Sequence, residues 1–335
     1  MTASEQPLLV PEGTRLWVLG SGKVGHEVHC IGIARALGLE PQVRPVRPRK
    51  LFAWTSPFGP IDPRDAPHRK DSSIAPPYPD IVLAAGRTTV PYLRRLKRET
   101  AGQVFTVFLQ DPRTGPGTAD MVWVPEHDRL RGENVLTTLT SPHPLRPHVL
   151  QAAREHPDPR LDHLPHPRVA MILGGPSAHH QFTAADIAQL AQASQAVVAK
   201  GNSLMVTPSR RTPPALLDAI RAALAEIEAG PDRAFVWDGS GDNPYAQIIA
   251  HADALIVTGD SVNMMGEAIV TGRPVHVYEP TGGHRKIAGF LDRLVESGWV
   301  RRWKGQLEDW TYEPVDATGQ IADEVARRYA AFRAR

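Results

Sequence analysis

The sequence lacks the features that are typical of disulfide-linked, membrane-spanning or secreted proteins. Its 335 residues include one cysteine, Cys30, which excludes an internal disulfide and favours a reducing compartment. It has no apolar run of about 18 residues, so we predict no membrane-spanning helix. The first residues lack a basic region followed by an apolar core, so we predict no secretory signal and a cytoplasmic location.

The sequence also lacks a large excess of charge of either sign. The 38 Lys and Arg residues nearly balance the 36 Asp and Glu residues, which gives a net charge of +2. This excess is too small to indicate nucleic acid as a partner. The hydrophobic fraction of 41% and the length fit a globular chain of two domains.

Short apolar runs alternate with helical segments along the first half of the chain. Residues 16–19, 42–46, 80–86 and 103–110 are expected to be strands, with helices between them, and residues 47–79 are expected to be irregular. This alternation of strands and helices predicts a parallel sheet covered on both faces. We therefore assign the chain to the α/β class.

A stretch rich in Pro and His, residues 151–167, is expected to be a linker or hinge before a second set of units that starts at Arg168. We predict two Rossmann-like domains facing a cleft, residues 1–160 and 161–315. Residues 316–335 are predicted to be a C-terminal helix that can cross back to the first domain. A single large sheet is the alternative.

Residues 252–280 are expected to form a strand, a tight turn, a helix and a second strand. Asp260 or Ser261 can cap the helix, whose N-terminus at the end of a parallel strand suits a phosphate group. Glu267 lies about two turns further on, where its carboxylate can accept the hydroxyl groups of a ribose. An ordinary βαβ unit without a ligand is the alternative.

The loop at residues 20–29 has the form GxGxxG after a strand. No acidic residue follows at the end of the second strand, which argues against NAD. We expect Gly22, Lys23 and Gly25 to approach a phosphate or an acceptor. His26 at the helix start is our candidate general base, and a merely structural turn histidine is the alternative.

Three more loops carry polar groups at predicted strand ends. After residue 109, Asp111 can orient a base or an acceptor hydroxyl, and Arg113 can hold a carboxylate or phosphate. Two loops in the second half are candidate donor-binding sites, with glycines for close approach and cations for phosphate: Gly174, Gly175 and Ser177, and Ser209, Arg210 and Arg211. Salt-bridged or solvated turns are the alternatives.

Two further segments can contact ligands. The backbone of residues 237–245 can read the edge of a nucleobase. Between Arg44 and Phe58, a group of basic residues lies beside a group of apolar and aromatic residues, a combination that favours an anionic membrane interface or a lipid-linked acceptor. A loop that buries its own aromatic residues is the alternative. His179 and His180 have no partner residues at metal-ligand spacing, so we expect no metal site.

Taken together, the motifs resemble one known family. GSGKVGHEVHCIGIARALG, FLQDPR, LGGPS, TPSRRTP and VTGDSVNMMGEAIVTGRPV follow the order seen in the mitochondrial fission (elongated-mitochondria) protein family of plants and bacteria. Members have been labelled predicted nucleoside-diphosphate-sugar epimerases. The resemblance implies the GT-B glycosyltransferase fold.

The first loop is also similar to that of the N-acetylglucosaminyltransferase that completes the peptidoglycan lipid precursor. The similarity implies that Gly22 and Gly25 approach phosphate and that His26 assists catalysis. We expect Asp111 to orient the acceptor hydroxyl that His26 deprotonates. It implies that Glu267 binds the ribose of a nucleotide-sugar. The implied donor-binding set is Gly174, Gly175, Ser177, Ser209, Arg210, Arg211, Asp260, Ser261 and Glu267.

These resemblances imply an inverting, metal-independent glycosyltransferase without a cofactor. Its donor is a nucleotide-sugar and its acceptor a cell-envelope or lipid-linked molecule, so we expect a cytoplasmic protein that can bind the inner face of the membrane. The plant members imply an alternative, a non-catalytic adaptor that recruits a dynamin-like fission factor to a membrane surface. A nucleotide-sugar epimerase is the third reading.

Overall fold

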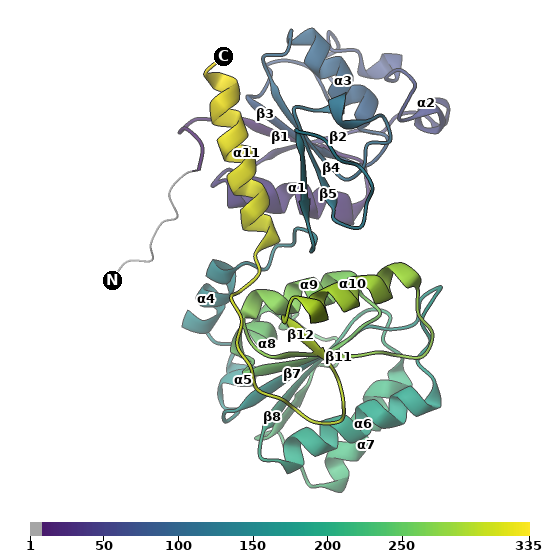
Figure 1. The fold of residues 1–335 in the computed structure, drawn as a ribbon, viewed down its shortest axis with the longest axis vertical. Helices are drawn as coiled ribbons and strands as arrows, with labels where there is room; N and C mark the ends of the chain where they lie inside the picture. The colour runs from purple at the N-terminus through teal and green to yellow at the C-terminus, as the bar shows by residue number, and fades with distance from the viewer. Residues whose placement is uncertain (1–8) are drawn as a thin grey trace. The chain divides into compact units, whose positions relative to one another are not determined.

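The computed structural model describes residues 9–335, which form two compact units (Figure 1). The first unit comprises the chain up to residue 144 together with residues 316–335, and the second comprises residues 145–315. Each unit contains one six-stranded sheet in which all strands are parallel. The predicted α/β class is therefore confirmed.

The sheet of the first unit has the strand order β2-β1-β3-β4-β5-β6. The inner strands β1, β3 and β4 are buried along their whole length, as expected for continuous apolar runs in a parallel sheet covered on both faces. The strands are β1 (Leu16–Gly20), β2 (Gln42–Pro45), β3 (Ile81–Ala85), β4 (Phe105–Leu109), β5 (Met121–Pro125) and β6 (Val135–Thr138).

Helices cover both faces of this sheet. On one face, α1 (Val24–Ala36) packs beside the C-terminal helix α11 (Ala317–Arg333), so the end of the chain completes the first unit (Figure 1). On the other face, α3 (Val90–Glu99) packs on a second core. Alternate residues of β1 face opposite cores, with Val18 in one and Leu19 in the other.

The sheet of the second unit has the order β12-β11-β10-β7-β8-β9. Because β7 lies between β8 and β10, the loops that follow these three strands meet at one edge of the sheet. The strands are β7 (Arg168–Leu173), β8 (Ser203–Pro208), β9 (Ala234–Val236), β10 (Ala254–Thr258), β11 (Val275–Tyr278) and β12 (Val300–Arg302).

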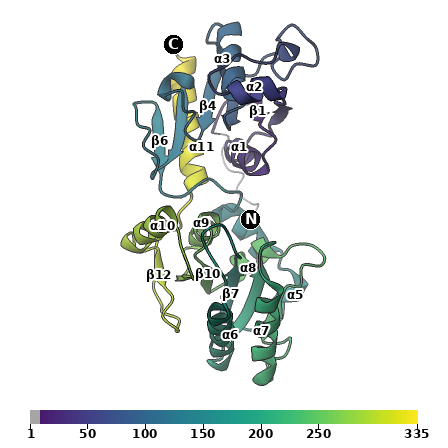
Figure 2. The same cartoon turned by 90° about the vertical axis from the view of Figure 1, so that its right-hand side faces the viewer.

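The second sheet is also covered on both faces. Figures 1 and 2 show α6 and α7 together on one face, where they form the core with β7 and β8. Thr183 and Asp186 form a complete capping box at the start of α6. The helices are α6 (Ala184–Ala199), α7 (Pro214–Glu226), α8 (Tyr245–His251), α9 (Val262–Ala268) and α10 (Arg285–Glu296).

The predicted linker at residues 151–167 is wrong for most of its length. Two helices, α4 (Pro147–Glu155) and α5 (Pro159–Asp162), occupy this region. Arg154 of α4 donates a hydrogen bond of 2.7 Å to the carbonyl of Ala250 in α8, so α4 is packed within the second unit. The first boundary therefore lies at residue 144, not at residue 160.

Two smaller elements also escaped prediction. The segment 47–79 contains the short helix α2 (Lys50–Thr55), and β12 adds an edge strand to the second sheet. Both are too short to show a clear hydrophobic period. No helix among residues 9–335 has the length and apolar character needed to cross a membrane.

Candidate functional site

The second unit has a pocket of about 580 Å³ at the carboxyl ends of β7 and β8. Its lining is largely apolar and includes two aromatic side chains, Trp237 and Tyr245, together with several polar side chains. This composition is typical of small-molecule sites. The lining residues that the argument uses are Ser209, Arg210, Trp237, Tyr245, Met264 and Glu267.

Glu267 of α9 presents a half-buried carboxylate to this pocket. The hydroxyl of Tyr245 donates a hydrogen bond of 2.5 Å to its Oε2. Burial raises the pKa of Glu267, and the hydrogen bond from Tyr245 opposes that rise. Burial and the neighbouring carboxylate also raise the pKa of Tyr245 well above its usual value, so Tyr245 remains a donor at neutral pH.

Asp260, at the end of β10, ties the three loops of this edge together. Its carboxylate accepts hydrogen bonds from the backbone N–H of Gly175 at 3.1 Å, from the Thr258 hydroxyl at 2.7 Å and from Nη2 of Arg211 at 2.9 Å. The Asp260 side chain is fully buried, with 0% exposure, whereas the Arg211 side chain is 44% exposed. We call Asp260, Arg211 and Gly175 the loop clasp.

The loop clasp explains why glycines occupy positions 174 and 175. A Cβ at Gly174 would overlap the carboxylate of Asp260, and a Cβ at Gly175 would overlap the carbonyl of Arg211. Arg211 also donates from Nη1 to the carbonyls of Gly175 and Pro176, at 2.7 and 3.1 Å. Its guanidinium thus holds the protein's own loops, although the sequence pattern suggested a phosphate ligand.

Ser209 and Arg210 remain on the pocket wall, where ligand contacts are possible. The Ser209 hydroxyl lies 3.2 Å from that of Thr212, which itself donates to the carbonyl of Gly174 at 2.6 Å. Arg210 is exposed and forms no ion pair with any residue between 9 and 335. Arg210, rather than Arg211, is therefore the cation available to an anionic ligand of this pocket.

Ser177 and Ser261 have local roles. The Ser177 hydroxyl accepts the backbone N–H groups of His179 and His180, at 3.2 and 3.1 Å, and so closes a turn. The Ser261 hydroxyl caps α9 by accepting the N–H of Met264 at 3.4 Å, which identifies Ser261 rather than Asp260 as the cap. Across residues 9–335, no group of three or more His, Cys, Asp or Glu side chains is arranged to hold a metal ion.

In the first unit, His26 lies on the first turn of α1, directly after the glycine loop. Its Nδ1 lies 3.0 Å from the hydroxyl of Ser21. Burial, followed by the positive charge of Lys23, lowers the pKa of His26, while Glu27 opposes the shift. The imidazole is therefore neutral at pH 7, as a general base must be.

The loop around His26 depends on two close approaches. Gly86, at the end of β3, has a φ of +90°, and a Cβ there would lie 2.6 Å from Nδ1 of His26. The carboxylate of Glu27 accepts the N–H of Gly22 at 3.0 Å and so fixes the glycine loop. Gly25 lies inside α1, and no heavy atom is within 4 Å of its ideal Cβ position.

Asp111 and Arg113 form an exposed turn after β4. The Asp111 carboxylate accepts the backbone N–H of Arg113 at 2.7 Å. Within the described chain, no hydrogen bond or ion pair joins Asp111 to His26, and β3 lies between their strands in the sheet. The role of Asp111 beside His26 stays a prediction.

Sequence reasoning missed Tyr245, Glu27 and Gly86 as contributors to these sites. Tyr245 lies 22 residues from Glu267, and no local pattern links the two. Glu27 could have been found, since a carboxylate in the first turn of a helix after a glycine loop is placed to accept the free N–H groups there.

Comparison with known proteins agrees with this architecture. The UDP-GlcNAc 2-epimerase of Methanocaldococcus jannaschii has a TM-score of 0.53 and 9% identity, covering 95% of this chain and 100% of that one. The UDP-GlcNAc 2-epimerase of Neisseria meningitidis, solved bound to UDP-GlcNAc, has a TM-score of 0.53 and 12% identity, with 96% and 92% coverage. The chain therefore has the GT-B fold of such enzymes.

Sequence comparison identifies the family. The mitochondrial fission protein ELM1 of Arabidopsis thaliana is 30% identical over 279 residues, which span 76% of this chain and 64% of that protein. The chain thus spans less than two thirds of the length of this relative. The profile of the family described as mitochondrial fission ELM1 matches residues 24–329. The chain belongs to the mitochondrial fission ELM1 family.

Proposed function

We propose that this protein is a glycosyltransferase that takes its sugar from a nucleotide-sugar donor bound in the pocket of the second unit. The observation that carries this proposal is the pocket with Glu267 in its wall. A carboxylate anchored by Tyr245 through one oxygen can accept the hydroxyl groups of a ribose through the other. A structural neighbour bound to UDP-GlcNAc supports a sugar nucleotide as the ligand.

The rest of the pocket suits the other parts of such a donor. Trp237 and Met264 supply apolar and aromatic surface for a nucleobase. Ser209 and Arg210 lie on the same wall, where a hydroxyl and an unpaired guanidinium can bind the diphosphate and stabilise its charge as it leaves. In this mechanism Arg211 acts through the loop clasp, by positioning Gly175 and the loop after β8.

In this proposal, the first unit binds the acceptor and supplies the general base. A neutral His26, oriented through Nδ1 by Ser21, accepts the proton of an acceptor hydroxyl at Nε2 as that oxygen attacks the anomeric carbon. The bond from that carbon to the diphosphate breaks, and the pair of electrons leaves with the diphosphate. We propose a cell-envelope or lipid-linked acceptor.

The first test is calorimetric titration of the protein with UDP, GDP, ADP and CMP. We expect one of them to bind and the Glu267→Ala variant to bind it more weakly. The His26→Ala variant should bind the same nucleotide with unchanged affinity and lose sugar transfer. Absence of binding by every nucleotide contradicts the proposal and favours an adaptor without catalysis.

The second test separates transfer from epimerisation. The protein is incubated with the sugar nucleotide that matches the bound base, without an acceptor, and the sugar is followed by proton NMR. We expect no change in sugar configuration. Epimerised sugar nucleotide formed under these conditions favours an epimerase, the activity named for both structural neighbours, over a transferase.

A further inference from the structure

The first unit carries a cluster of exposed apolar side chains on α2 and the turn after it. Leu51, Trp54 and Phe58 are 65%, 78% and 71% exposed, although side chains of this size are usually buried. Single exposed apolar residues are common on protein surfaces, but three within eight residues form a patch. We call these three residues the apolar patch.

The apolar patch is held in place by arginine side chains. Arg87 donates to the carbonyl of Ser56 at 2.9 Å, and Arg49 forms paired 2.8 Å hydrogen bonds with the carboxylate of Asp62. Arg94 donates to the carbonyls of Pro57, Phe58 and Gly59, at 2.6, 3.2 and 3.3 Å. The apolar side chains are therefore exposed on a segment that the protein fixes, which lowers the entropic cost of binding through them.

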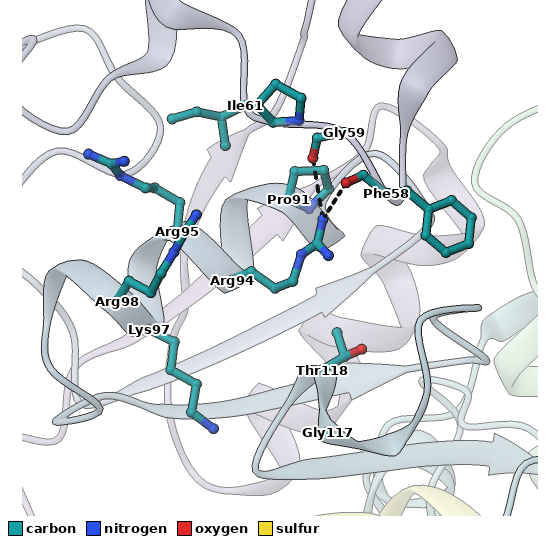
Figure 3. A pocket seen from close by; sticks show the side chains of 11 residues that line it. Phe58, Gly59, Ile61, Pro91, Arg94, Arg95, Lys97, Arg98, Gly117 and Thr118 are labelled. Atoms are coloured by element: carbon teal, nitrogen blue, oxygen red, sulfur yellow. Dashed lines mark hydrogen bonds between the residues drawn. The ribbon is translucent and has the colours of Figure 1, made fainter.

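A basic pocket of about 570 Å³ adjoins the apolar patch, and Phe58 belongs to both. Figure 3 shows Arg94 at the centre of this pocket, pointing toward the backbone of Phe58 and Gly59, with Lys97 on the same helix. The pocket lining contains no carboxylate. Its four cationic residues are Arg94, Arg95, Lys97 and Arg98.

Neighbouring acids neutralise only part of this charge. Arg95 pairs with Glu99 at 2.6 Å, and Lys97 pairs with Asp120 at 2.5 Å. Among the described residues, Arg94 donates hydrogen bonds to backbone carbonyls alone and forms no ion pair, and Arg98 forms no ion pair either. Burial, followed by the charge of Arg98, lowers the pKa of Arg94.

We propose that the apolar patch and the basic pocket together form a docking site for a membrane surface rich in anionic phospholipids. Trp54, Leu51 and Phe58 enter the interfacial layer, and the headgroup phosphate binds beside Arg98 and Arg94. Apolar side chains beside unpaired cations match the layered chemistry of such a surface, apolar below and negatively charged above. A soluble phosphate would use the cations alone and would leave the apolar patch in water.

This inference goes beyond the transfer reaction, since it holds equally for an enzyme and for an adaptor. The test uses the full chain in sedimentation with vesicles of phosphatidylcholine, alone or with about one third phosphatidylglycerol. We expect binding to the anionic vesicles only, with an affinity that falls as salt is raised. Equal binding to both kinds of vesicle, or binding to neither, overturns the proposal.

Matched variants locate the contact. Trp54→Ser and Arg98→Glu should each weaken binding to anionic vesicles by roughly tenfold or more, because one removes inserted surface and the other reverses a headgroup contact. Val28→Ser and Arg129→Glu change an exposed valine and an exposed arginine elsewhere in the same unit, and both should bind as the wild type does. Wild-type binding by Trp54→Ser and Arg98→Glu overturns the proposal, even if the patch then binds a protein or a nucleic acid.

The membrane test is independent of the nucleotide test. Trp54 lies in the first unit, whereas the residues that line the nucleotide pocket lie in the second. Trp54→Ser should therefore bind nucleotide as the wild type does. An unchanged unfolding midpoint for Trp54→Ser checks that the variant folds. A protein that binds nucleotide but no vesicles overturns the docking site alone, and one that binds anionic vesicles but no nucleotide overturns the donor pocket alone.

Discussion

The hydroxyl of Tyr245, at the first position of α8, donates a 2.5 Å hydrogen bond to Oε2 of Glu267 in α9. No other described residue forms a hydrogen bond with this carboxylate, so Oε1 is available to a ligand. Two helices that are separate in the sequence thus present one oriented acceptor at the pocket wall. The pair gives the proposed donor site its most direct test.

Replacing Glu267 with Ala should weaken nucleoside diphosphate binding about 10- to 100-fold. A hydrogen bond to a charged group contributes about 1.5–3 kcal/mol, and the ribose would lose its acceptor. Tyr245→Phe keeps the carboxylate but frees it to move, so a smaller loss of roughly threefold to tenfold is expected. Isothermal titration calorimetry measures both changes.

Glu296→Ala is the matched control, because Glu296 is an exposed carboxylate at the end of α10, outside the pocket lining. It should bind nucleotide with wild-type affinity. An affinity of Glu267→Ala equal to that of this control would remove Glu267 from the binding site.

The loop clasp leads to a prediction about stability. Asp260→Ala should lower the free energy of unfolding by about 3–5 kcal/mol, because it removes the partner of a guanidinium and leaves the Gly175 N–H and the Thr258 hydroxyl without their acceptor. Urea unfolding followed by circular dichroism measures the change.

The control for this prediction is an exposed ion pair in the same unit. Asp218 and Arg221 lie 3.4 Å apart with side chains 73% and 44% exposed, so Asp218→Ala should cost less than about 1 kcal/mol. If the two variants lose the same stability, the loop clasp does not hold the second unit together.

The fold was largely predictable because its signals are local. Runs such as ALIVT and IVLAA show buried parallel strands directly, and the Thr183 capping box lies within four consecutive residues. The helix α4 was hidden because its Pro- and His-rich neighbourhood resembles a linker. It packs against α8, and the hydrogen bond that joins them connects Arg154 and Ala250, which are 96 residues apart.

The candidate site was predictable by position but not by contact. The sequence identified Asp260, Arg211 and Gly175 as loop residues at strand ends, all expected to face a ligand. That Asp260 and Arg211, 49 residues apart, bind each other follows from the strand order β10-β7-β8, which sequence periodicity does not reveal. By contrast, the hydrogen bond from the N–H of Arg113 to Asp111 is a local Asx turn, which the Asp-Pro pair in FLQDPR could have indicated.

Gly175→Ala should destabilise the second unit by about 2–4 kcal/mol, because the new methyl group overlaps the Arg211 carbonyl, which is rigid backbone. Gly289→Ala in α10 is the matched control: no heavy atom lies within 4 Å of its ideal Cβ position. This control should be stabilised by about 0.5–1 kcal/mol through helix propensity. Thermal unfolding compares the two, and a Gly175→Ala variant as stable as the wild type would show that the loops separate easily.

His29 should make the stability of the protein depend on pH. Burial, followed by the nearby His26 and His143, lowers the pKa of His29 from 6.5 to about 4, and its Nδ1 has no hydrogen-bond partner among the described residues. Between these two values the unfolded chain binds a proton that the folded chain does not. The free energy of unfolding therefore falls as pH is lowered through this window, by about 3 kcal/mol from this group.

The variant His29→Gln removes this titration. On going from neutral pH to about pH 4, the wild type should therefore lose about 3 kcal/mol of unfolding free energy relative to the variant. Urea unfolding at a series of pH values measures the shift. His68→Gln, at an exposed histidine of the same unit, should keep the wild-type pH dependence. A constant difference between wild type and His29→Gln across the pH range would mean that His29 has the same pKa in the folded and the unfolded chain. The first turns of α1 would then be open to water around the proposed base.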